Sequence, residues 1–171
     1  MRRLVIVVMV LLVAASASAW EVIRQADFTG VEGWVVLARP ADYHEGGWSH
    51  SDPEIVIRWW DSEWGVDVFL ITGGPSVGSN PEVYLQLGEG SELKFLSGSL
   101  SGDASGDNTK VFMPRSDVQG FVDEMAALEE DDFMTVGVDL SDGRILFASF
   151  FMSGFSTALK EWKNAHSPGI E

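Results

Sequence analysis

Short β-rich runs divided by turn signals are the feature of this 171-residue sequence that most constrains its fold. The clearest two, Glu54–Asp61 and Gly65–Gly73, are rich in β-branched and aromatic residues and are separated only by Ser62-Glu63-Trp64. This spacing predicts a β-hairpin. Because both strands are apolar on both faces, we expect them to lie centrally in a sheet that is covered on both sides.

Other runs continue this pattern along the chain. Met134, Val136 and Val138 alternate with small or polar residues, which predicts a strand with one wet face. Asp142-Gly143 predicts the turn that leads into the following strand. The remaining predicted strands are Trp20–Phe28, Gly33–Ala41, Val83–Leu87, Leu93–Leu96, Thr109–Met113 and Arg144–Met152, and the predicted long loops are Asp42–Pro53 and Ser97–Asn108.

A first helix is predicted shortly after Met113. Its apolar residues recur on one helical face at Val118, Phe121, Val122, Met125 and Leu128. Ser116 and Gln119 match a capping box, which places the start of the helix at Ser116. The acidic run Glu129–Asp132 follows, and because the helix dipole disfavours negative charge at that end, we expect the last turn to fray.

A second helix is predicted near the C-terminal end of the chain. Ser153 is its expected N-cap, and its apolar stripe consists of Phe155, Ala158, Leu159 and Trp162. Residues 166–171 are expected to form a flexible tail. About eight short strands, with two short α-helices near the C-terminal part, predict a mainly β fold: a single-domain β-sandwich or half-open barrel.

Residues 1–19 have the pattern of a secretory signal peptide. Arg2 and Arg3 precede the apolar run Leu4–Ala15, and Ala17-Ser18-Ala19 is a small-residue cleavage signature. The run is shorter than the roughly 20 residues of a membrane-spanning helix, which favours cleavage over a retained anchor. We expect a single β-rich domain over residues 20–165 and a periplasmic or secreted protein with no membrane span after cleavage.

Charge and cysteine content exclude several classes of function. The chain has 26 acidic and 11 basic residues, a formal net charge of −15, and loss of Arg2 and Arg3 with the leader would make it more negative. A surface of this sign repels phosphates and anionic lipid head groups, so no nucleic-acid partner is expected. Because the sequence has no cysteine, disulfides, thiolate metal sites and a cysteine nucleophile are all excluded.

No signature of catalysis stands out. The histidines are His44, His50 and His166, and no residue marks one of them as the base of a catalytic triad. His44, His50 and Asp52 form the densest group of potential metal ligands, but their spacing matches no helix-borne zinc pattern. The aspartates of the loop 101–108 lack the spacing of an EF-hand. We expect no enzyme, no catalytic residue, no cofactor and no metal site.

Clustered tryptophans are the most prominent binding signal. Trp48, Trp59, Trp60 and Trp64 fall close together, at one end of the predicted central hairpin. One interpretation is that they anchor loops onto the sheet, because tryptophan is usually largely buried. The other is an aromatic contact surface for a sugar or a protein. The contact residues expected for a partner or ligand are His44, Trp48, His50 and Trp64.

Several motifs also follow one another in a distinctive order. Gly33-Trp34-Val35-Val36 comes early, Lys110-Val111-Phe112-Met113 leads into a helix ending in acids, and the hairpin Met134–Met152 precedes Gly154-Phe155-Ser156-Thr157-Ala158-Leu159. This order resembles the invasion-associated locus B family of exported alphaproteobacterial proteins, which close with a strand running into a Gly-Phe-Ser-x-Ala-Leu helix. The chain departs from that family in having no cysteine. The resemblance implies a β-rich periplasmic or outer-surface protein linked with host-cell association, and it implies no catalytic residues.

Binding is the kind of function that these features favour. We expect an exported non-enzymatic binding protein of the cell envelope, whose partner is another envelope or extracellular protein. The alternative is a carbohydrate- or small-ligand-binding module that uses the clustered tryptophans. A third hypothesis is a metal-assisted hydrolase that uses His44, His50 and Asp52.

Overall fold

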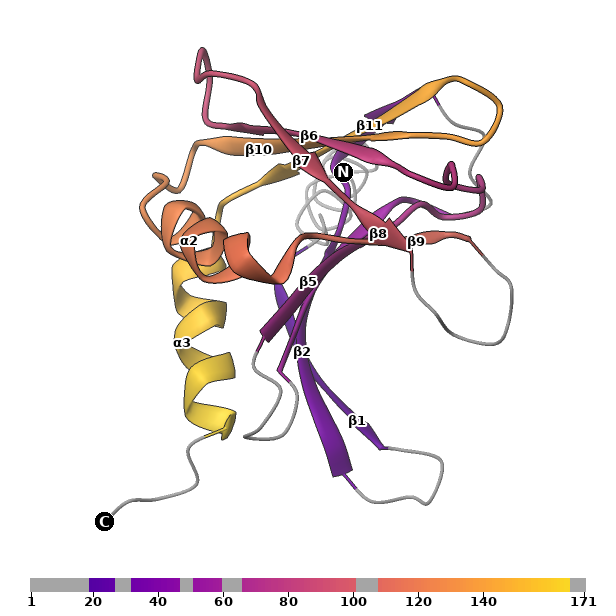
Figure 1. The fold of residues 1–171 in the computed structure, drawn as a ribbon. Coiled ribbons are helices and arrows are strands. Elements are labelled where there is room, and N and C mark those ends of the chain that lie inside the picture. Colours follow the sequence, from indigo (N-terminus) through magenta and orange to yellow (C-terminus); the bar gives the residue numbers. More distant parts are fainter. Residues whose placement is uncertain (1–18, 27–31, 47–50, 60–65, 101–107, 167–171) are drawn as a thin grey trace, which may run out of the picture.

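Two antiparallel β-sheets and two helices make up the described part of the chain (Figure 1). This computed structural model describes residues 19–26, 32–46, 51–59, 66–100 and 108–166. Of the expected signal peptide only Ala19 is described, and of the expected C-terminal tail only His166, which is the last residue of a helix. The predicted mainly β sandwich is therefore confirmed for the described residues.

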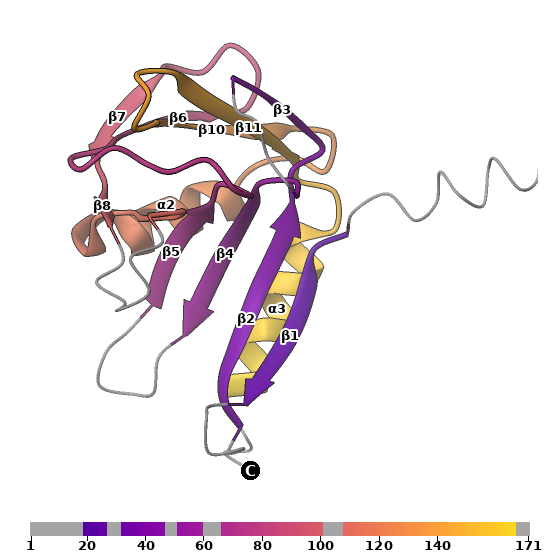
Figure 2. The same cartoon turned by 90° about the vertical axis from the view of Figure 1, so that its right-hand side faces the viewer.

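The six-stranded sheet contains the predicted central hairpin. In order across the sheet it consists of β1 (Glu21–Ala26), β2 (Glu32–Pro40), β4 (Glu54–Trp59), β5 (Val66–Ile71), β9 (Lys110–Phe112) and β8 (Ser99–Leu100). Figure 2 shows β1, β2, β4 and β5 side by side. The pairing of β4 with β5 is antiparallel throughout, and both strands are internal to the sheet. The predicted hairpin and its central position are thus confirmed. The expected cover on both sides is wrong for the described residues, because the outward apolar cluster contains side chains of this sheet alone.

The five-stranded sheet is built from the two hairpins later in the chain and one short added strand. In order across the sheet it consists of β3 (Tyr43–Glu45), β11 (Ile145–Phe151), β10 (Phe133–Asp139), β6 (Glu82–Leu87) and β7 (Lys94–Ser97). Both predicted hairpins, β6 with β7 and β10 with β11, are confirmed. The assignment of Asp42–Pro53 wholly to a loop was wrong, because β3 pairs with β11 at the edge of the sheet.

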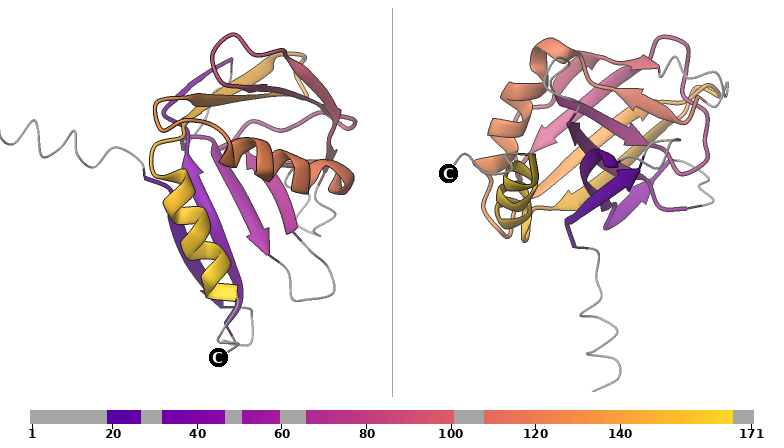
Figure 3. Two further views of the ribbon diagram at one scale, coloured as in Figure 1. Left: turned by 90° about the vertical axis from the view of Figure 1, so that its left-hand side faces the viewer. Right: turned by 90° about the horizontal axis from the view of Figure 1, so that it is seen from below.

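One core fills the space between the sheets and continues under the helices α2 (Arg115–Ala126) and α3 (Phe155–His166). The helices pack on the six-stranded sheet, α2 against β5 and α3 against β1 and β2 (Figure 3). The apolar residues of both helices belong to the same core as the inward-facing side chains of the five-stranded sheet. The predicted stripe of α3 is confirmed, since its members are all buried: Phe155, Ala158, Leu159 and Trp162.

Both helices begin at a residue other than the predicted one. Pro114 occupies the N-cap position of α2, which has no side-chain cap hydrogen bond, so Ser116 lies inside the helix and the predicted capping box was wrong. Gly154 directly precedes α3, so Ser153 is not its N-cap. Gly154 has a φ of +80°, which favours glycine, and its N–H donates to the Glu130 carboxylate at 2.6 Å. A distant carboxylate thus satisfies a donor at the start of α3.

The acidic run Glu129–Asp132 forms a turn after α2 and does not belong to its last turn. The N–H of Glu129 donates to the Asp132 carboxylate at 2.8 Å, and the N–H of Asp132 donates to the Glu129 carbonyl at 3.1 Å. The carboxylates of this run therefore accept backbone N–H groups, one locally and one at α3. The expected frayed helix end is replaced by an ordered turn.

An ion pair with a buried arginine connects the two sheets with α3. Arg39 of β2 is only 4% exposed and donates from Nε and Nη2 to the two carboxylate oxygens of Asp42, at 3.0 and 2.8 Å. Its Nη1 donates to the Ser153 carbonyl at 3.4 Å. Asp42 also accepts the N–H of Phe151 in β11 at 2.8 Å. The pair therefore holds β2, β11 and the start of α3 together.

Replacement of Trp162 by alanine is expected to destabilise the protein severely. Its side chain is 1% exposed, and truncation of a buried tryptophan costs about 3–5 kcal/mol because the cavity collapses only in part. Urea unfolding of Trp162→Ala measures this loss in the free energy of unfolding. The neighbouring Lys163→Ala, on the exposed side of α3, is the control and should change it by less than about 0.5 kcal/mol. Equal effects of the two variants would contradict the packing of α3.

Candidate functional site

The sequence-predicted contact cluster is described only at His44. Trp48, His50 and Trp64 lie outside the described residues. His44 is in β3 opposite the buried Ala148, so its side chain is on the inward side of the five-stranded sheet. Its Nε2 lies 3.4 Å from the Asp52 carboxylate, and its Nδ1 is buried with no hydrogen-bond partner among the described residues. His44 and Asp52 are thus brought together.

A metal centre finds no support in the described residues. Nowhere among them do three histidine or carboxylate side chains gather closely enough to hold a metal ion. His44 and Asp52 provide two candidate ligands, and the third that was predicted, His50, is outside the described part of the chain. Of the tryptophans, Trp20 and Trp162 are buried in the core and so offer no surface to a ligand.

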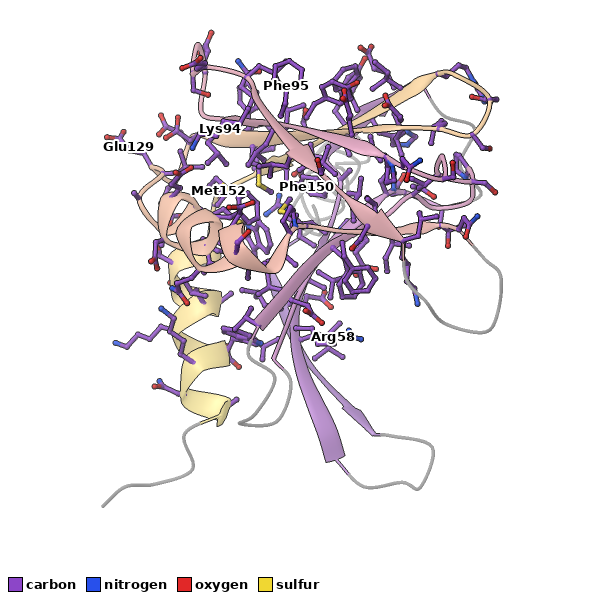
Figure 4. The ribbon with its side chains drawn as sticks, in the orientation of Figure 1. Arg58, Lys94, Phe95, Glu129, Phe150 and Met152 are labelled. Carbon is purple, nitrogen blue, oxygen red and sulfur yellow. The ribbon has the colours of Figure 1, made fainter. Side chains whose placement is uncertain are left out.

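The outward side of the five-stranded sheet carries a row of aromatic residues that the sequence analysis did not single out. We call this surface the aromatic face and define it by Tyr43, Tyr84, Phe95, Phe133, Phe147 and Phe151. It draws at least one aromatic side chain from every strand of the sheet. Figure 4 shows Phe95 on this outer side, whereas Phe150 and Met152 point between the layers. Neither helix covers the aromatic face (Figures 1 and 3).

The strand register places the central rings of this face in contact. Phe95 is opposite Tyr84, Tyr84 is opposite Gly137, and Gly137 is opposite Phe147. The centroids of Tyr84 and Phe95 are 5.4 Å apart with an edge-to-face angle of 75°, and those of Tyr84 and Phe147 are 6.3 Å apart. A Cβ on Gly137 would lie 2.6 Å from the Phe147 ring, so glycine allows that ring to lie across β10.

This face holds most of the large hydrophobic side chains that are exposed among the described residues. These side chains are Phe95 at 64%, Tyr43 at 61%, Phe151 at 49% and Leu93 at 42%. Three of them belong to the aromatic face, and Leu93 directly precedes β7 at its edge. Contiguous exposed apolar side chains are rare on monomeric proteins and mark interaction sites. The aromatic face is therefore the leading candidate for a functional surface.

The hydroxyl of Tyr84 lies between two carboxylates at the middle of this face. It is 3.0 Å from Oδ1 of Asp139 and 3.3 Å from Oε2 of Glu82. Desolvation of the phenol, together with the hydrogen bond and charge of Asp139 and the proximity of Glu82, raises the pKa of Tyr84 to about 12. The phenol therefore stays neutral at physiological pH, and it donates its proton to only one carboxylate at a time.

The outer side of the six-stranded sheet is a second candidate for a functional surface. Its apolar residues Val36, Ala38, Val56 and Phe69 form a small cluster that is separate from the main core. Above it, Arg58 lies with its Cζ 5.2 Å from the Phe69 ring centroid and pairs with Asp67 at 3.1 Å (Figure 4). Because these apolar residues are at most 6% exposed, a partner would bury little further apolar area here.

A groove next to that cluster has an acidic side. A cavity of about 410 Å³ is lined by residues that include Glu21, Asp52 and Glu54, and an adjoining one of about 160 Å³ reaches Arg58. Burial, and to a lesser degree the charge of Glu21, raises the pKa of Glu54 above its ordinary value. The lining of the larger cavity combines carboxylates with small and aliphatic side chains and includes no aromatic ring.

The sequence did contain a signal for the aromatic face, although tryptophan clustering drew attention elsewhere. Tyr84, Phe147 and Phe151 are aromatic residues at positions that alternate with core residues, where a solvent-facing strand would carry polar side chains. The strand Arg144–Met152 was predicted to be apolar on both faces, and the structure shows that only one of these faces is covered. Which face stays open depends on the packing of the layers.

Comparison with known proteins yields no match for this chain: no family model, no curated protein and no solved structure is similar to it. Within the described ranges, neither helix has the length and apolar character needed to span a bilayer.

Replacement of Glu54 by glutamine is expected to stabilise the protein in a pH-dependent way. Because the folded-state pKa of Glu54 is raised, the protonated form is favoured in the fold, and ionisation lowers stability as the pH rises through that pKa. The stability of Glu54→Gln and the parent should agree below pH 4.5, the ordinary value, and diverge in favour of the variant above it. Thermal unfolding from about pH 3 to about pH 8, which begins below the ordinary carboxylate pKa values and ends well above them, measures the gap.

Glu89→Gln is the control for this measurement, since it removes one negative charge from an exposed turn. A gap between Glu54→Gln and the parent that stays constant over the whole pH range, or that matches the gap of the control, would contradict the buried environment of Glu54.

Proposed function

We propose that this protein is an exported, non-enzymatic binding protein of the cell envelope that captures another envelope or extracellular protein through its aromatic face. One observation carries the proposal: the large hydrophobic side chains exposed in the described chain gather on one uncovered sheet surface and its edge. The signal-peptide pattern of residues 1–19 supports export. The resemblance to the invasion-associated locus B family supports an envelope location.

The construction of the aromatic face suits recognition of a protein. Its side chains stand on paired strands, so little conformational freedom is lost when a partner binds. Tyrosine and other aromatic residues are enriched at the centres of interfaces, where they provide most of the binding energy. The edge-to-face packing of Tyr84 on Phe95 holds both rings in place before any partner arrives.

The extent of the face favours a protein over a small ligand. Five strands spaced as in an ordinary sheet span roughly 20 Å, and the aromatic face uses all of them. Small ligands prefer concave sites that enclose most of their surface. A carbohydrate that stacks on one or two of these rings remains the alternative, and it becomes one of the outcomes of the test below.

The double variant Phe95→Ser/Tyr43→Ser is expected to abolish capture of the partner while the protein stays folded. Both side chains are more than 60% exposed, so their loss should lower the free energy of unfolding by no more than about 1.5 kcal/mol, including the contact of Phe95 with Tyr84. The measurement is chemical cross-linking and pull-down from the envelope fraction and from host-cell extract, with the captured proteins identified by mass spectrometry.

Gln119→Ser/Asn164→Ser is the matched control, because it changes two exposed, uncharged side chains on the helices. The proposal requires the same captured protein with the parent and this control, and its loss with the face variant. If all three capture the same proteins equally, the aromatic face is not the interface. If the face variant instead loses binding to a glycan in a fluorescence titration, the carbohydrate alternative replaces the protein partner.

A further inference from the structure

The charge on the aromatic face is of one sign. The outward positions of the five strands carry the carboxylates of Glu45, Glu82 and Asp139 and no lysine or arginine. Lys94 of β7 lies on the inward side, opposite Leu85, and pairs with Glu124 of α2. No ion pair between described residues includes any of the three outward carboxylates.

These carboxylates border the central rings. Glu45 is opposite Phe147 in the register, and Glu82 and Asp139 are both within hydrogen-bond reach of the Tyr84 hydroxyl. A single phenol proton does not satisfy two carboxylates, so the negative charge beside Tyr84 is only partly compensated. A cation placed over these rings would gain a cation–π interaction and a charge-assisted hydrogen bond at the same place.

We propose that the occupant of the aromatic face is a basic segment of the partner protein, with an arginine or lysine side chain seated over Tyr84 and Phe95 beside Glu82 and Asp139. This inference rests on the proposed function and names the chemistry of its partner. Charge complementarity argues for it, because an acidic protein of net charge −15 attracts a basic partner at long range. A second copy of this chain would bring the same carboxylates to the interface and is disfavoured.

Arginine fits this place better than lysine. Its planar guanidinium stacks on an aromatic ring while its edge donates to a carboxylate, whereas the lysine ammonium is a compact and strongly hydrated charge. The face offers the ring of Tyr84 with carboxylate oxygens next to its hydroxyl. Nucleic acids and anionic lipids are negatively charged, so the carboxylates of this surface repel them.

The test uses the full chain and two synthetic probes. One is a nonapeptide in which arginine alternates with serine and glycine, and the other replaces each arginine by citrulline, which keeps the shape and removes the charge. Calorimetric titration at low and moderate salt measures the affinities. We expect the arginine peptide to bind at least about tenfold more tightly than the citrulline peptide, with an affinity that falls as salt is raised.

Glu82→Gln/Asp139→Asn is the variant that tests the location of the cation. It should weaken binding of the arginine peptide about tenfold or more, whereas the charge-matched control Glu89→Gln/Glu161→Gln should stay within about twofold of the parent. Thermal unfolding of both variants establishes that they are folded. Equal weakening by both pairs, or equal binding of the arginine and citrulline peptides, would overturn the inference.

The same variants separate this inference from the proposed function. In the envelope pull-down, loss of the partner with Phe95→Ser/Tyr43→Ser but full retention with Glu82→Gln/Asp139→Asn would refute the basic segment and leave the aromatic interface standing. Retention with both double variants would refute both. Loss with both, together with retention by the Glu89→Gln/Glu161→Gln control, is the result that the inference requires.

Discussion

Burial of the inward sheet faces in one shared core is the constraint on which the rest of the structure depends. Strand alternation points residues such as Val136, Leu146 and Phe150 toward the six-stranded sheet, and α2 and α3 complete the core beside them. The Arg39–Asp42 pair joins β2, β11 and the start of α3 through hydrogen bonds. Since the inward faces of both sheets are buried in this core, the sheets can meet other molecules only through their outward faces and edges.

The two outward faces differ in how far their apolar side chains are exposed. On the six-stranded sheet, Val36, Ala38 and Val56 are already buried in a small separate cluster below Arg58. On the five-stranded sheet, Phe95 and Tyr43 are mostly exposed, and paired strands hold them in position. An interface gains most from rigid aromatic side chains that still have surface to bury, which is why the proposed contact lies on the aromatic face.

Local pattern was a good guide to the elements, whereas the predicted contact residues Trp48, His50 and Trp64 lie outside the described residues and stay a prediction. The hairpin of β4 with β5 and the stripe of α3 follow from periodicity within a few neighbouring residues, and both were predicted. The helix caps were predicted wrongly at Ser116 and Ser153, because Pro114 and the contact of Gly154 with Glu130 determine where the helices begin. The sequence pointed to clustered tryptophans, whereas among the described residues phenylalanine and tyrosine form the exposed aromatic surface.

The sequence by itself determined the mainly β class and the spacing at which apolar residues recur along each strand and helix. Side-chain alternation in a strand and the 3.6-residue repeat of a helix are properties of the local backbone. Only the tertiary structure decided that Phe95, Tyr84 and Phe147 form one row. Their contact requires β7, β6, β10 and β11 to pair in one register, with Gly137 opposite both Tyr84 and Phe147. It also requires the helices to pack on the other sheet, so that this face stays open. Register and layer packing result from burial over the whole chain, and no short segment contains that information.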